Sequence, residues 1–351
     1  MYDDDEIIPV NFKESIRKRP GMYLGHNGAK GIINLISGVL KECIKVCDTD
    51  QFVFTVSILG DNSFSIDVEG KKDLSPFIQL LIKPLIEIEC FYAKVLLVIS
   101  ETLELLNDHF RFFFNIGKLP LDSHLSNSEL SKHFILNFSI DKSVINDTEV
   151  DYLALNEELI LMPILNRKVE IILKDLRRKY LNQNYYHFPQ GIFYVFSRIT
   201  DKVRGKPKFE IIYDGSMGEN KYQIAIAYRT DWCPSPSITS FANDIQTTDG
   251  GALVNGVIDG VALGCRKYVK ANGVSNCQIK RKKLLSRLIL VCAVRGGDFI
   301  YGGSFRETLE SEEVRTQAKE ITQQIVFCYL QNNSEIANEF LFRFDITKQF
   351  L

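Results

Sequence analysis

Four consecutive basic residues form the longest run of positive charge in the chain: Lys280, Arg281, Lys282 and Lys283. Clustered Lys and Arg side chains bind phosphate groups and supply the salt-dependent part of DNA affinity. Arg266, Lys267 and Lys270, which precede the run, extend the patch. The same pattern is typical of a solvated face, so both readings stay open. No aromatic residue is interleaved within 280–283, which argues against a platform that stacks single-stranded bases.

A second group of candidate site residues consists of two glutamates and a glycine. Glu42 lies on a predicted, mostly apolar helix, where it can bind a cation or be ion-paired or solvated. Glu69 and Gly70 end a predicted strand, in the segment VEGKK. Eight cysteines are scattered without Cys-x-x-Cys spacing, so the sequence indicates reduced thiols and predicts no metal site.

Composition narrows the class of protein. The chain has 351 residues and a net charge of −2, which excludes a chain-wide polycation but allows local basic patches. The acidic start MYDDDEIIPV lacks the features of a signal peptide, and the most apolar stretch is interrupted by charges. We therefore expect a cytoplasmic protein without a membrane segment.

The elements that must position these residues alternate between helix and strand. Apolar spacing predicts helices over 31–47, 148–162, 250–269 and 311–331. Alternation predicts strands over 51–59, 63–70, 130–140, 168–176, 208–214, 221–229, 284–294 and near 95–101. Ser311 is the expected N-cap of the last helix, with Glu312 and Glu313 near its positive end. Two domains meeting near residue 205 are predicted, spanning 1–205 and 206–351.

Three ordered motifs carry a family resemblance. IRKRPGMYLG before a helix, then FANDIQTTDGGALVNGVIDGV, then RLILVCAV with YGGSFRETLESEEVR resemble the DNA gyrase B and topoisomerase IV B subunits of the GHKL superfamily. The resemblance implies an α+β or α/β architecture: a GHKL (Bergerat-type) α/β sandwich, followed by a transducer domain of the ribosomal protein S5 domain 2-like fold. This inference concerns fold rather than activity.

Measured against that family, the residues of an ATPase site are missing. The resemblance places Gly38 where the family has its general base, a Glu, and places Glu42 where an Asn binds Mg²⁺. Gly38 has no side chain that can accept a proton. The adenine-binding Asp falls at Val68 or Glu69, and of the following Gly-Arg-Gly only Gly70 remains.

Three further parts of the family's site also differ. No Gly-x-x-Gly-x-Gly phosphate loop occurs between Gly70 and Thr200, and the lid that the family carries there is expected to be deleted. The family's Gln-Thr-Lys, whose Lys reaches the γ-phosphate, corresponds to a loop ending at Arg306, and Arg is not interchangeable with Lys. Glu42, Glu69, Gly70 and Arg306 therefore mark a degenerate nucleotide site, with no catalytic residue.

The resemblance also leads to functional expectations. The chain is predicted to be a pseudo-ATPase without a cofactor, acting as a dimerising scaffold or regulator of gyrase or in association with DNA. The alternative is a diverged, ATP-hydrolysing subunit of a type II topoisomerase, which would need ATP and Mg²⁺. A homodimer, or a heterodimer with a gyrase subunit, is expected to use an arm over residues 1–12, with Tyr2, Ile7, Ile8 and Val10 as anchors. The family's metal-binding cleavage domain would follow Leu351, so strand passage by this chain alone is not expected.

Overall fold

The computed structural model describes residues 12–47, 49–82, 90–115, 130–177, 181–231, 233–273, 279–303 and 306–342. The chain divides into two compact units, residues 1–189 and 190–351. The sequence predicts a division near residue 205. In the structure the division falls earlier, because helix α8 (Ile192–Thr200) packs against strands of the second unit.

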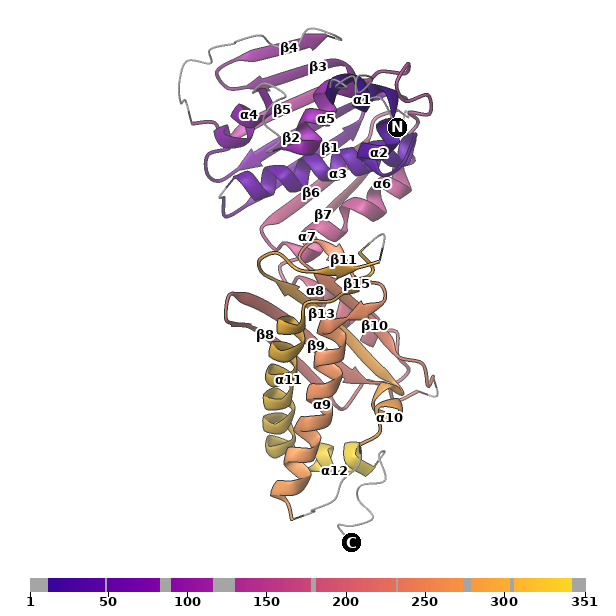
Figure 1. The fold of residues 1–351 in the computed structure, drawn as a ribbon, viewed down its shortest axis with the longest axis vertical. Coiled ribbons are helices and arrows are strands. Elements are labelled where there is room, and N and C mark those ends of the chain that lie inside the picture. The colour runs from indigo at the N-terminus through magenta and orange to yellow at the C-terminus, as the bar shows by residue number, and fades with distance from the viewer. Residues whose placement is uncertain are drawn as a thin grey trace, which may run out of the picture. The chain divides into compact units, whose positions relative to one another are not determined.

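The first unit contains a sheet of seven strands in the order β4-β3-β5-β2-β1-β6-β7 (Figure 1). The strands are β1 (Phe52–Ile58), β2 (Ser63–Gly70), β3 (Ser100–Asn107), β4 (Arg111–Asn115), β5 (His133–Ile140), β6 (Val169–Asp175) and β7 (Asn182–His187). The described helices are α1 (Phe12–Lys18), α2 (Pro20–Leu24), α3 (Ala29–Val46), α4 (Ser75–Ile82), α5 (Phe91–Ile99), α6 (Tyr152–Leu159) and α7 (Leu161–Leu165). The predicted helix at 31–47 and the hairpin of β1 and β2 are confirmed.

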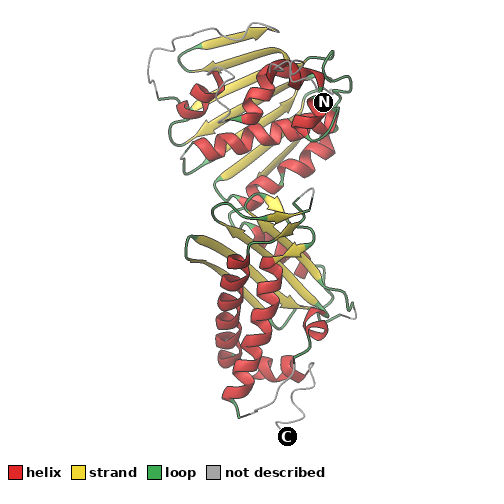
Figure 2. Cartoon of the chain, viewed as in Figure 1, coloured by secondary structure: helices red, strands yellow, loops and turns green. Residues whose placement is uncertain are grey.

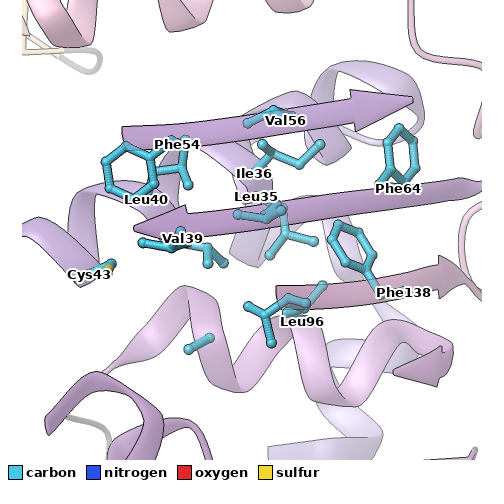
Figure 3. Close-up of a cluster of buried hydrophobic side chains, with 14 of the residues drawn as sticks. Leu35, Ile36, Val39, Leu40, Cys43, Phe54, Val56, Phe64, Leu96 and Phe138 are labelled. Carbon is cyan, nitrogen blue, oxygen red and sulfur yellow. The ribbon is translucent and has the colours of Figure 1, made fainter. Parts of the chain in front are cut away.

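Strict alternation gives this sheet one buried face. In β2 the residues Phe64, Ile66 and Val68 are buried, while the residues between them are half-buried or exposed. Figure 3 shows Leu35, Ile36 and Val39 of α3 pointing toward the side chains of β1 and β2. The apolar stripe of α3 therefore forms the core with one face of the sheet, and the other face keeps its polar residues near water.

Helix α5 corrects the prediction of a strand near 95–101. Residues 95–99 are helical, and β3 begins only at Ser100. Five of the nine residues in α5 are fully or almost fully buried aliphatic side chains, so no polar face reveals a helical period. Lys94 is also buried there, and its Nζ donates to the carbonyl oxygens of Leu80 (2.6 Å) and Leu81 (3.3 Å) near the end of α4.

The RKRPG motif has a structural role in the first unit. Arg17 donates from Nη1 to the carbonyl oxygen of Val98 (3.0 Å) and forms an ion pair with Asp141, which is 8% exposed at the side chain. Ser143 also donates to Asp141, from its backbone N–H and its hydroxyl. The motif thus ties α1 to α5 and to the segment after β5.

The second unit contains a sheet in the order β11-β10-β13-β9-β8 and a small sheet in the order β12-β15-β14. Its strands are β8 (Glu210–Met217), β9 (Asn220–Tyr228), β10 (Ser237–Ala242), β11 (Ile245–Gln246), β12 (Gly250–Gly251), β13 (Leu288–Arg295), β14 (Tyr301–Gly302) and β15 (Thr308–Leu309). Besides α8, its helices are α9 (Ala252–Ala271), α10 (Arg281–Leu285), α11 (Glu312–Asn332) and α12 (Ser334–Phe342) (Figure 2). The strands predicted over 208–214 and 221–229 and the two long helices of this unit are confirmed. The strand predicted over 284–294 begins only at Leu288, because Leu284 and Leu285 belong to α10.

Helices α9 and α11 approach each other closely along a stripe of glycines. A Cβ atom built on Gly260 would lie 2.5 Å from Cβ of Thr322 and 2.6 Å from the carbonyl oxygen of Lys319. Gly256 and Gly264, one helical turn away on either side, meet α11 in the same way. Ser311 stands at the N-cap position as predicted, but its hydroxyl accepts the N–H of Ile300 rather than a bond from its own helix.

Candidate nucleotide site

The first component of the site is the contact between α3 and α5. Gly38 is buried in the middle of α3, where it faces the ring of Tyr92 at the start of α5. A Cβ atom built on Gly38 would lie within 2.6 Å of three ring atoms of Tyr92, much closer than real Cβ contacts. The aromatic ring therefore fills the space that a side chain at position 38 would need.

The second component is Glu42, one helical turn beyond Gly38. Its carboxylate accepts the backbone N–H groups of Tyr92 (2.7 Å) and Ala93 (2.9 Å). These are N–H groups of the first turn of α5, which have no partner within their own helix. A helix N-terminus is a ready anion site, and here the anion is a carboxylate of the protein itself.

The environment of Glu42 makes its charge costly. Burial raises the pKa of Glu42 above its usual range, and the N–H groups of Tyr92, Ala93 and Phe91, with the nearby Lys45, oppose the shift without cancelling it. The structure adds a role that the sequence does not predict, because the Glu42 carboxylate accepts two backbone N–H groups of α5. Glu42 holds α5 against α3.

The third component is the end of β2, where the structure separates the predicted residues. Val68 is 1% exposed and points toward the helices, so an apolar side chain occupies the position of the adenine-binding Asp. Glu69 is exposed on the opposite face of the sheet, away from Glu42, so its place in a nucleotide site stays a prediction. A Cβ atom at Gly70 would lie 2.8 Å from Cδ2 of Leu74, so close packing of the chain explains this glycine.

Arg306 belongs to the second unit and is described only within it. Its guanidinium carbon lies 5.6 Å from the centre of the Tyr301 ring, and its φ of 60° is in the left-handed region. Residues 304–305 of the same loop lie outside the described residues, as do residues 83–89, which fall in the interval where the lid is predicted to be deleted. The predicted arm lies almost wholly outside the described residues too, since the described chain begins at Phe12.

The basic run opens α10. Lys280, Arg281 and Lys282 are exposed, and Lys283 is half-buried. Arg281 forms an ion pair with Asp259 of α9 (3.1 Å) and donates to Asn255, so part of the positive charge is neutralised inside the unit. Lys267 lies 4.5 Å from the centre of the Phe327 ring.

The residues that sequence reasoning missed are those supplied by α5. Nothing in the sequence pairs Tyr92 with Gly38 or the start of α5 with Glu42, because the sequence predicts a strand near 95–101 and no helix over 91–99. Among the described residues, no helix is long and apolar enough to cross a membrane.

Comparison with known proteins gives a consistent result. The family model of DNA gyrase B matches residues 191–348. The chain is 24% identical to the DNA gyrase B subunit of Clostridium acetobutylicum and 23% identical to the DNA topoisomerase 4 B subunit of Mycoplasma capricolum. Each match covers 96% of this chain but only 57% of the relative.

Solved structures show a similar fold. The 43K ATPase domain of Thermus thermophilus gyrase B, crystallised with an aminocoumarin, superposes with a TM-score of 0.76 at 18% identity, over 94% of this chain and 93% of that domain. The B subunit of Myxococcus xanthus DNA gyrase gives a TM-score of 0.70 at 19% identity, over 95% of this chain and 99% of that one. The sandwich and the transducer-like part thus have the fold that the sequence motifs predicted.

Proposed function

We propose that this chain, which resembles the N-terminal ATPase and transducer region of gyrase B and topoisomerase IV B subunits along nearly its whole length, does not hydrolyse ATP. It acts as a scaffold or regulator that keeps the fold of that region. The chain spans about 57% of the length of the curated relatives that it matches, so the activity of the whole relative is not assumed for it.

The observation that supports this proposal is the closed contact between α3 and α5. Tyr92 occupies the space above Gly38, and the Glu42 carboxylate occupies the first N–H groups of α5. A general base at position 38 would collide with the ring, and an incoming phosphate would have to displace a carboxylate of the same charge. ATP hydrolysis requires a base that activates water and N–H groups that hold the phosphate. The Tyr92 ring opposes the first requirement and the Glu42 carboxylate opposes the second.

ATP and Mg²⁺ do not fit the described residues. Val68 offers no hydrogen bond to adenine, and Gly38 offers no base. The Glu42 carboxylate is already held by two N–H groups at 2.7 and 2.9 Å.

A diverged, ATP-hydrolysing topoisomerase subunit is the second candidate. It is favoured by the similarity to ATPase domains over both units of the chain and by the glycine that remains at position 70. In this case α5 would have to move away from α3 when nucleotide binds, releasing Glu42 and Tyr92.

One experiment separates the two candidates. Purified full-length chain is assayed for Mg²⁺-dependent ATP turnover and for thermal stabilisation by a non-hydrolysable ATP analogue, beside a gyrase B ATPase region as positive control. Saturation at 100 times Kd would stabilise by about 2.7 kcal/mol, which is readily measured. We expect neither turnover nor stabilisation, and turnover above background would establish the second candidate.

The variant Gly38→Glu refines this experiment. We expect it to remain inactive and to lose stability, because the new side chain meets Tyr92. The double variant Gly38→Glu/Tyr92→Ala relieves that collision and serves as its matched partner. If Gly38→Glu alone gains ATP turnover, the proposed obstruction by Tyr92 is wrong.

As a partner we propose either a second copy of this chain or a gyrase subunit. The relatives are named as subunits, and apolar residues of the arm provide anchors for association. Since Glu42 already fills the start of α5, association would not depend on ATP. DNA is a further proposed ligand, through the exposed side chains of Lys280 and Lys282.

A further inference from the structure

A cluster of metal-ligating side chains lies on the polar face of the first sheet, opposite the face that packs against α3. Glu69 of β2 pairs directly with His133 of β5 in the antiparallel register. Asp67 lies two residues before Glu69, so its side chain projects from the same face. Sequence analysis expected no metal site, because these residues are spread over 66 positions and only the strand register unites them.

The three side chains converge on one point. Nε2 of His133 lies 2.9 Å from Oδ1 of Asp67, and one ligand atom from each of Asp67, Glu69 and His133 lies within 4.8 Å of the others. Oδ1 of Asp108, in the turn between β3 and β4, lies 3.9 Å from Nδ1 of the same ring. At this distance Asp108 attracts the ring electrostatically without a hydrogen bond, and a small approach would place it where a carboxylate orients a metal-binding histidine.

The charge of the cluster is not balanced by neighbouring basic groups. Among the described residues, no Lys or Arg forms an ion pair with Asp67, Glu69 or Asp108, so three carboxylates face one imidazole. The neighbours of Glu69 and Asp67 across β1 are Val53 and Thr55, which are uncharged. Two carboxylates on one side of a strand repel each other unless a cation lies between them.

We propose that Asp67, Glu69 and His133 bind a divalent transition-metal ion of the Zn²⁺ type, with Asp108 as a positioning residue for the imidazole. One nitrogen and two carboxylate ligands suit Zn²⁺ at about 2.0–2.2 Å, and water completes the coordination. The imidazole disfavours Ca²⁺ and Mg²⁺, which prefer oxygen ligands. The site is on the other face of the sheet from Gly38 and Glu42, so the proposal does not depend on the absence of ATP hydrolysis.

The test is titration of the full-length chain with Zn²⁺ by calorimetry, and with Co²⁺ by its visible absorption, in a buffer without chelators. His133→Ala should remove one equivalent of bound metal. His187→Ala is the matched control: His187 lies on β7 of the same sheet with a single carboxylate, Glu170, at 4.0 Å, and its loss should leave the binding unchanged. Asp108→Asn should weaken binding by roughly 10- to 100-fold, and Asp67→Asn by at least as much.

Circular dichroism of each variant separates loss of a ligand from loss of the fold. The proposal is supported if His133→Ala remains folded and loses the site while Mg²⁺ and Ca²⁺ in excess do not displace Zn²⁺. It is overturned if the wild-type chain shows no saturable site, if folded His133→Ala binds as the wild type does, or if Mg²⁺ competes on equal terms.

Discussion

Replacing Glu42 by alanine would test how the start of α5 is held. The change leaves the N–H groups of Tyr92 and Ala93 without their acceptor, in a partly buried place. A hydrogen bond to a charged group contributes about 1.5–3 kcal/mol, and loss of a helix cap costs about 0.5–2 kcal/mol. Burial raises the pKa of Glu42, so its charge is partly disfavoured in the folded state. We therefore take the low end of these ranges for the two N–H bonds together and expect the free energy of unfolding to fall by about 2 kcal/mol.

The measurement is unfolding by urea and by heat, followed by circular dichroism. For a unit of this size, about 2 kcal/mol corresponds to a fall in Tm of roughly 4–8 °C. Glu157→Ala is the matched control, because Glu157 is exposed on α6 and should change stability by less than about 0.5 kcal/mol.

Inorganic phosphate provides a second readout. In Glu42→Ala the start of α5 is open to an external anion, so phosphate at ten times its Kd should restore about 1.4 kcal/mol, while the wild type should not respond. If Glu42→Ala is as stable as the wild type, or if phosphate stabilises both proteins equally, the reasoning about α5 is refuted.

The pH dependence has a defined sign. Since the folded pKa of Glu42 is raised, the proton-linked part of its contribution to stability is fully present below the unfolded value of about 4.3 and is lost as pH rises through the folded value, whereas the two N–H bonds to the carboxylate remain. The difference in unfolding free energy between wild type and Glu42→Gln should therefore shrink as pH rises from about 4 to 7. A difference that grows over that interval would contradict the raised pKa.

Three further predictions concern other parts of the chain. Gly260→Ala should destabilise the second unit by about 1–3 kcal/mol through overpacking, whereas Gly297→Ala, with nothing within 4 Å of the added Cβ, should be neutral in thermal unfolding. Arg17→Ala should cost about 2–3 kcal/mol by leaving Asp141 buried without its partner. Burial raises the pKa of Asp141, but hydrogen bonds from Ser143 and Arg17 outweigh it, so the folded pKa is lowered. The stabilisation by the ionised carboxylate should therefore be lost as pH falls below about 4, and Arg17→Ala should lose less stability over that range. Deleting residues 1–12 should convert the assembly in solution to monomers, measured by light scattering with and without a gyrase subunit. An unchanged number of chains per assembly would show that the arm is not part of the interface.

The parts of the fold that the sequence predicted have a visible period. The apolar stripe of α3 and the alternation in β2 each leave a polar face in water, so the pattern identifies the element. Helix α5 has no such face, because it is covered by the sheet and by its neighbouring helices. A short apolar run of this kind is compatible with a buried strand or a buried helix.

The candidate site was only half predictable for a related reason. Alignment of a motif could place Gly38 and Glu42 one helical turn apart, since both belong to one helix. Their partners come from α5, about 50 residues away, and only tertiary packing brings the ring of Tyr92 onto Gly38. The same holds for Glu69 and His133, which the register of β2 and β5 makes neighbours.

The packing of Tyr92 on Gly38 also couples two positions genetically. A side chain at 38 is incompatible with an aromatic ring at 92, and a small residue at 92 leaves a void beside a glycine at 38. Each single change therefore passes through a less stable protein, whereas the paired change does not. In a deep mutational scan the two positions should show strong positive epistasis, so that the residue tolerated at 38 depends on the size of the residue at 92.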